Sequence, residues 1–220
     1  MKLKIDVPDS LSEITLSQYQ KFEKIDNDEN RNTNFILHKL VEIFCNLDLK
    51  DIIKIKWSSV SKIANSINEL FEKDHKLIRT FSLNGVEYGF IPNLDDMTLG
   101  EYIDLDNSVS DWQEMHKAMA VLFRPVTYKK GDMYLIKDYQ AEEVDELKHM
   151  PLDVVLGSLF FFYNLRKELL NTIPSYLKLE MQKKGMTIME KLPSQKSGDG
   201  INLSMDWLRE MFSKSNQLQN

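Results

Sequence analysis

The chain has 220 residues, of which 42% are hydrophobic and 28% charged, and these proportions are ordinary for a soluble globular protein. Its formal net charge of −6 argues against a nucleic-acid-binding role, because such proteins normally carry a basic face. The single cysteine, Cys45, permits no internal disulfide bond and no cysteine-based metal cluster, so a reducing compartment is its natural location. We expect Cys45 to be a small buried hydrophobic residue.

The sequence also argues against secretion and membrane insertion. The N-terminal stretch MKLKIDVPDSLSE lacks the apolar core of a signal peptide. The most apolar run, VVLGSLFFFYNL over residues 154–165, is well short of the roughly 20 residues that span a bilayer. We therefore interpret this run as a buried helix and expect a protein of the cell interior that does not bind membranes.

Helices are predicted for the first part of the chain. Thr15 can cap a helix in which Gln18 completes a capping box, and this helix should run to about Ile25. Amphipathic patterns predict three more helices: over 34–46, over about 49–55, and from a cap at Ser58 or Ser59 to about Phe71.

A hairpin signal interrupts this helical pattern at FSLNGVEYGF, residues 81–90. Residues that favour strands stand on both sides of Asn84-Gly85, a pair that tolerates positive φ at both positions of a two-residue type I′ turn. Because an isolated two-stranded hairpin is marginally stable in water, we expect it to pack on the helical core or to extend the sheet of a neighbour.

The capping pattern of the first helix returns after the hairpin, where Thr98 and Glu101 occupy the positions of Thr15 and Gln18. Either the chain consists of two duplicated halves, or two unrelated helices begin with the same capping motif. We favour the second alternative, because the sequences that follow the two motifs diverge. Further elements are predicted in this order: a helix from about Trp112 that ends at Arg124-Pro125, a second hairpin over 127–136, an acidic helix over 141–148, the buried helix from Pro151 through Leu170, and a helix from Pro174 to about Lys184.

The sequence predicts a C-terminal arm, which consists of a linker and a final helix over residues 192–220. Residues 192–203 are typical of a flexible linker, and Ser204 can cap a final helix within 204–220. One face of that helix carries four apolar side chains, and we predict that it docks on a neighbouring subunit or partner in preference to its own domain. The predicted partner interface consists of Trp207, Leu208, Met211 and Phe212, together with the hairpin turn at Asn84 and Gly85.

Signals for catalysis or cofactor binding are missing from the sequence. There is no phosphate-binding loop, no dinucleotide fingerprint and no HExxH motif. The four histidines stand far apart, and His116, which has the best position, fits a core or boundary residue better than a ligand or base: His38, His75, His116 and His149. We therefore predict that the protein is not an enzyme, with no catalytic residues, no cofactor and no metal site.

A family resemblance arises from an ordered series of motifs between Phe81 and Tyr139. The series comprises a hairpin that ends in YGFIP, the helix start TLGEYIDL, the helix end LFRP, and YLI shortly before Tyr139. Together with EITL near the N-terminus, it resembles small proteins encoded among the virion assembly genes of tailed bacteriophages, including the crAss-like phages. Such gene clusters encode ring proteins of the head-to-tail connector and tail assembly chaperones, and the motifs are folding signals without catalytic content.

These observations predict a mainly α-helical fold. A single helical domain over 1–191 carries hairpin insertions near 81–91 and 127–136, and is followed by the linker over 192–203 and a C-terminal interaction helix over 204–220. The resemblance implies a non-enzymatic structural protein of the phage virion, a ring-forming head-to-tail connector component bound near the portal. The alternative is a tail or head assembly chaperone that is absent from the mature particle. The implied partners are copies of the chain itself and portal or tail proteins, and the implied location is the virion, after synthesis in the host cytoplasm.

Overall fold

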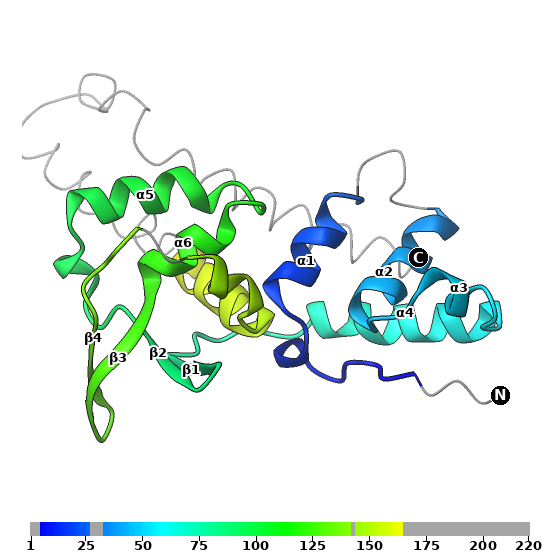
Figure 1. Ribbon diagram of the computed structural model, residues 1–220, viewed down its shortest axis with the longest axis horizontal. Helices are drawn as coiled ribbons and strands as arrows, with labels where there is room; N and C mark the ends of the chain where they lie inside the picture. The colour runs from blue at the N-terminus through cyan, green and yellow to red at the C-terminus, as the bar shows by residue number, and fades with distance from the viewer. Residues whose placement is uncertain (1–4, 27–32, 142–143, 165–220) are drawn as a thin grey trace, which may run out of the picture.

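Helices and one small antiparallel sheet make up the computed structural model, which describes residues 5–26, 33–141 and 144–164 (Figure 1). In chain order the elements are the 3₁₀ helix η1 (Leu11–Glu13), α1 (Leu16–Glu23), α2 (Asn34–Phe44), α3 (Leu49–Ile52), α4 (Trp57–Phe71), β1 (Thr80–Leu83), β2 (Val86–Phe90), the 3₁₀ helix η2 (Leu94–Asp96), α5 (Leu99–Val109), α6 (Met115–Leu122), β3 (Phe123–Lys130), β4 (Met133–Ile136) and the 3₁₀ helix η3 (Asp145–His149). A further helix covers residues 152–164. The predicted fold class, mainly α with small hairpins, is confirmed.

Both predicted capping boxes are present. At α1 the Gln18 amide N–H donates to Thr15 Oγ1 over 3.2 Å, and the Thr15 N–H donates to Gln18 Oε1 over 2.9 Å. At α5 Thr98 and Glu101 make the same two bonds, at 3.3 and 2.6 Å. These short-range exchanges satisfy amide groups that the first helical turn leaves unpaired, which is why sequence alone locates both helix starts.

The predicted start of α4 is wrong by two to three residues. Lys56 is the N-cap and the helix begins at Trp57, so Ser58 and Ser59 already lie in its first turn. The amides of Ser59 and Val60 donate to the Lys56 carbonyl oxygen, at 2.8 and 3.1 Å. A backbone cap without a side-chain bond therefore replaces the predicted serine cap.

The four strands form a single sheet in the order β1-β2-β3-β4, with every neighbouring pair antiparallel. Asn84 has φ of 51° and Gly85 of 81°, and Leu83 pairs with Val86, which confirms the predicted two-residue turn of type I′. The second predicted hairpin is β3–β4, with Gly131 at φ 60° in its turn.

The sequence did not predict that the two hairpins join. Phe90 pairs with Phe123 and Tyr88 with Pro125, so β2 and β3 link hairpins that are more than thirty residues apart in the chain. The α6 helix ends at Leu122 because the Leu122 carbonyl accepts from the Ile91 amide at 2.8 Å, and the chain continues directly as β3. Sheet pairing, and not only Pro125, therefore terminates this helix.

Two smaller expectations are corrected. The predicted acidic helix over 141–148 is a 3₁₀ helix over Asp145–His149, which begins later and is shorter; residues 142–143 lie outside the described part. The buried helix opens after Pro151 as predicted and is described to residue 164, so its predicted continuation to Leu170 and the helix from Pro174 lie outside the described residues.

The helix over 152–164 lies at the centre of the molecule, where its N-terminal half is almost fully buried (Figure 1). Its start is tied to the start of α1, since Leu16 N–H donates to the Met150 carbonyl and Leu152 N–H donates to the Ile14 carbonyl. At Gly157 the helix contacts the segment after α4 so closely that an added Cβ would lie 2.3 Å from the Lys76 carbonyl oxygen. One hydrophobic core therefore links the α1–α4 part to the sheet.

The molecule is elongated along this arrangement. Figure 1 shows α2, α3 and the start of α4 at one end of the long axis, and α5 with the β3–β4 hairpin at the other. The α1 helix, α6 and the helix over 152–164 lie between the two ends. Side chains at the two ends are therefore too far apart to contribute to one site within one chain.

Candidate functional site

The histidines are dispersed in the structure as they are in the sequence. The ring of His38 packs edge-on against Trp57, with centroids 5.4 Å apart, and the ring of His75 lies 5.1 Å from Phe160. His116 is 3% exposed and His149 lies on η3. Within the described residues, no three His, Cys, Asp or Glu side chains gather in a way that could hold a metal ion.

A polar hollow of about 490 Å³ lies between α1, the start of α6 and η3. It is lined by Ser17, Gln20, Lys21, Lys24, Gln113, Glu114, His116, Lys117, Asp145 and Lys148. Beside it, the Gln20 side-chain amide donates to the Trp112 carbonyl at 2.8 Å, and the Gln113 amide donates back to the Gln20 carbonyl at 3.0 Å. These bonds fasten α1 to α6, so the polar groups of the hollow have a structural task.

His116 is the titratable group of most interest in this hollow. Its Nε2 lies 3.6 Å from Asp145 Oδ1, and its Nδ1 lies 3.5 Å from Gln20 Nε2. Burial lowers the pKa of His116, and Lys148 adds to that effect, so the ring is held neutral. A ring that is almost entirely covered and already engaged is poorly placed to act on a substrate.

The most enclosed ion pair joins α5 to β3. Arg124 Nη1 donates to Glu101 Oε1 at 2.8 Å, and both side chains are nearly buried. Burial opposes the ionisation of Glu101, but its hydrogen bonds with Thr98 and the neighbouring Arg124 outweigh that effect and lower its pKa. Because Glu101 also closes the α5 capping box, this pair fixes the helix to the sheet.

In the described part of the chain, exposed large apolar side chains group in three places, apart from the single residues Phe35 and Val86, and the first place is the outer edge of the sheet. Tyr128 and Leu135 are cross-strand partners in β3 and β4, and Met133 follows the same face of β4. They are 57%, 61% and 72% exposed, in the order Tyr128, Leu135, Met133. We call this surface the hairpin stripe; it borders β4, an outer strand of the sheet.

The second place is the start of α5. Leu99 is 75% exposed, and Tyr102 and Ile103, three and four residues later, share its face of the helix. Asp95 and Asp96 precede it in η2 and are exposed. We call these five residues the acidic α5 surface.

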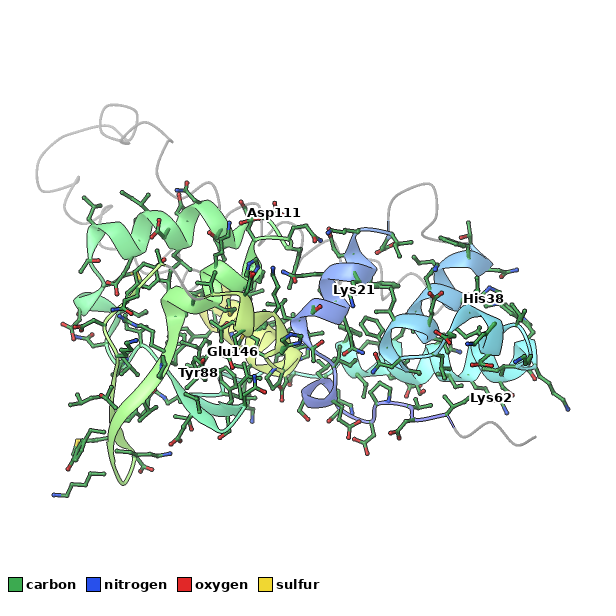
Figure 2. The ribbon with its side chains drawn as sticks, in the orientation of Figure 1. Lys21, His38, Lys62, Tyr88, Asp111 and Glu146 are labelled. Carbon is green, nitrogen blue, oxygen red and sulfur yellow. The ribbon has the colours of Figure 1, made fainter. Side chains whose placement is uncertain are left out.

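The third place is at the opposite end of the molecule. Ile53 is 74% exposed, and Leu49 and Trp57, four residues before and after it in the chain, are also exposed. Four exposed lysines belong to the same stretch of the sequence: Lys50, Lys54, Lys56 and Lys62. We call this group the basic α3–α4 corner; Figure 2 labels His38 and Lys62 at this end of the molecule.

Only part of the predicted partner interface lies in the described structure. Asn84 and Gly85 form an exposed turn, and the Asn84 amide donates to Glu146 Oε1 of η3 at 2.7 Å, so the turn is fastened to its own chain. Figure 2 shows Tyr88 and Glu146 next to each other in this region. Trp207, Leu208, Met211 and Phe212 lie outside the described residues.

Sequence reasoning missed all three exposed apolar surfaces. Leu99, Tyr102 and Ile103 have the i, i+3, i+4 spacing of a helix face, and a second face of α5, with Leu105 and Val109, enters the core. Two apolar faces on one short helix are a detectable signal that one of them is left for a partner.

Comparisons with protein families, curated proteins and solved structures found no match. In the part of the chain that the structure describes, every helix is too short or too polar to cross a membrane.

Proposed function

We propose that the chain is a non-enzymatic structural protein of a tailed-phage virion, a ring-forming component of the head-to-tail connector that binds near the portal. The observation that carries this proposal is the placement of large exposed apolar side chains at both ends of an elongated molecule. Exposed apolar groups that cluster are typical of surfaces that a partner covers.

The motifs that resemble phage virion-assembly proteins support the same role. Apart from EITL, which lies at the start of α1, they lie in the part of the chain that forms the sheet, α5 and α6. The polar hollow offers little for catalysis, because its histidine is covered and the side chains of Gln20 and Gln113 are engaged in hydrogen bonds between α1 and the start of α6.

The hairpin stripe suits contact with a different phage protein. The β4 strand is an outer strand, and the exposed side chains of Met133 and Leu135 alternate along it with the buried Tyr134. A partner strand can pair with such an edge through backbone hydrogen bonds while its side chains cover the apolar groups. A portal or tail protein is the partner that the proposed role requires.

Mass spectrometry of purified virions tests the proposal. The chain is expected at a fixed stoichiometry relative to the portal protein, in particles that have been washed in high salt. The control is a lysate of infected cells, in which the chain must be present. Presence in the lysate together with absence from particles would overturn the proposal in favour of an assembly chaperone.

A further inference from the structure

We infer that copies of this chain join head to tail, with the acidic α5 surface of one copy docked on the basic α3–α4 corner of the next. This inference rests on the proposed ring-forming role and names the contact that would build the ring. Both surfaces belong to the described part of the chain, and each presents apolar side chains that the chain itself leaves exposed.

The apolar parts of the two surfaces consist of similar side chains. Leu99 and Ile53 are the two most exposed large hydrophobic side chains of the described residues, at 75% and 74%. Each has an aromatic neighbour, Tyr102 on α5 and Trp57 at the start of α4. Aromatic side chains are enriched in the buried cores of protein interfaces, where they often contribute most of the binding energy.

The charged parts of the two surfaces are opposite in sign. Residues 92–111 contain six acidic residues and no lysine or arginine. Three of them, Asp95, Asp96 and Asp111, are exposed, whereas Glu101 is buried against Arg124. Residues 48–62 contain four lysines and two acidic residues, Asp48 and Asp51, which gives a formal charge of +2 (four positive, two negative).

The charges nearest the apolar groups are accessible to a partner. Asp95 and Asp96 are exposed and form no ion pair with a lysine or arginine that the structure describes. At the corner, Lys50 pairs with Asp48 and Lys54 with Asp51, but these pairs are exposed, and such pairs are weak enough to exchange partners.

The positions of the surfaces decide what kind of assembly they would form. They lie at opposite ends of the long axis, so the contact uses two different patches and leaves one free patch on each outer copy (Figure 1). A contact of this kind continues from copy to copy and closes into a ring when the rotation between copies fits.

A second copy is also the occupant that the charges favour. A membrane surface or a nucleic acid would be repelled by the acidic α5 surface, since both carry negative charge. The complementary basic and apolar surface is present on the chain itself, whereas the hairpin stripe remains available for a different protein.

The first test is a charge exchange on the full-length chain. Asp95→Lys with Asp96→Lys, or Lys54→Glu with Lys56→Glu, is expected to weaken self-association about tenfold or more in analytical ultracentrifugation, because like charges then meet across the contact. The variant with all four changes is expected to recover association. Matched controls change the same charges elsewhere: Glu69→Lys with Asp74→Lys, and Lys21→Glu with Lys24→Glu.

The second test determines whether the contact is head to tail. Leu99→Lys should block only the α5 surface, and Ile53→Glu only the corner; both sites are so exposed that the fold should tolerate the change. Each variant alone is expected to be monomeric. A mixture of the two is expected to give a dimer that grows no further, because one intact contact remains between them.

The outcomes separate this inference from the proposed function. A wild-type chain that stays monomeric at its highest soluble concentration, or that assembles equally well with all the changes, overturns the head-to-tail contact. Neither result affects the detection of the chain in virions, which tests the proposed role by itself. Monomeric variants that fail to form the mixed dimer would also overturn the contact.

Discussion

Two histidines, the buried His116 and the half-buried His75, make stability depend on pH. Burial is the main cause that lowers the pKa of each ring. Lys148 and Lys117 add to the effect at His116, against the opposing pull of Glu114 and Asp145. At His75, the Phe71 carbonyl, Asp153 and Asp74 oppose it.

The sign of the pH effect follows from these directions. Both rings are more basic in the unfolded chain, where the pKa is 6.5, than in the folded protein. Well above pH 6.5 both histidine rings are neutral in the folded and in the unfolded chain. Below pH 6.5 the rings of the unfolded chain bind protons, whereas those of the folded chain stay neutral until the pH is lower. The free energy of unfolding should therefore fall as the pH drops below 6.5, towards the lowered folded-state values.

We predict that this fall is smaller in His116→Gln than in the wild type. Urea unfolding at a series of pH values between about 7.5 and 5.5 gives the free energy of unfolding of each protein. The control is His149→Gln, the same exchange at an exposed histidine. Equal pH dependence in the wild type and His116→Gln would contradict the assigned role of His116.

Two helical glycines provide a second comparison at the residue scale. An added methyl group at Gly157 would meet the backbone of Lys76 at 2.3 Å, whereas at Gly100 the nearest atom, Thr98 Oγ1, is 4.0 Å away. Gly157→Ala should destabilise by about 1–3 kcal/mol, because backbone cannot move aside as a side chain can. Gly100→Ala should stabilise by about 0.5–1 kcal/mol, because alanine loses less backbone entropy. Thermal melts measure both variants. If the two melting temperatures shift in the same direction, the close packing at Gly157 is contradicted.

Cys45 shows what could be predicted for a single residue. Its place in an apolar helical pattern predicts burial, and it is 6% exposed. Burial, with Asp6 nearby, raises the pKa of its thiol to about 11, which suits an inert core residue. The contact at Gly157 could not be predicted, because it depends on a segment that lies about eighty residues earlier in the chain.

At the scale of elements, local signals located the helix starts and the turn. The two capping boxes and the Asn84-Gly85 turn each depend on residues no more than three positions apart. The pairing of β2 with β3 brings Phe90 opposite Phe123, and no local pattern specifies that contact. The end of α6 depends on the same pairing, so its boundary with β3 could not be predicted either.

The β1–β2 turn gives the prediction at this scale. Asn84→Ala with Gly85→Ala should destabilise by about 1–3 kcal/mol, because alanine is strained at the positive φ of both positions. Asn84→Gly is the matched control, since it keeps the backbone relaxed and removes only the bond to Glu146. Chemical unfolding measures both variants. If the control loses as much stability as the double alanine variant, the loss comes from the missing bond to Glu146 and not from strain in the turn.

For the whole molecule, composition and pattern predicted the fold class but not its surfaces. No local pattern shows whether an apolar residue such as Leu99 or Ile53 enters the core or remains exposed. Their exposure follows from which face of each helix the rest of the chain covers, and this is a property of the complete fold. The candidate interfaces therefore emerge only when all the elements are in place.

The last prediction concerns the C-terminal arm. The hydrophobic core of the described residues, with its partly buried neighbours, extends from Ile5 to Tyr163. Deletion of residues 192–220 should therefore leave a folded monomer whose melting temperature is nearly unchanged. Oligomer or particle assembly should be lost, because the apolar face with Trp207 and Phe212 is predicted to dock on a neighbouring subunit or partner. In the full-length chain, Trp207→Ala with Phe212→Ala should weaken that docking by about 2 kcal/mol or more, as expected for interface anchors. Arg209→Ala in the same predicted helix is the control. A truncated chain that unfolds or aggregates alone would show that the arm belongs to its own core.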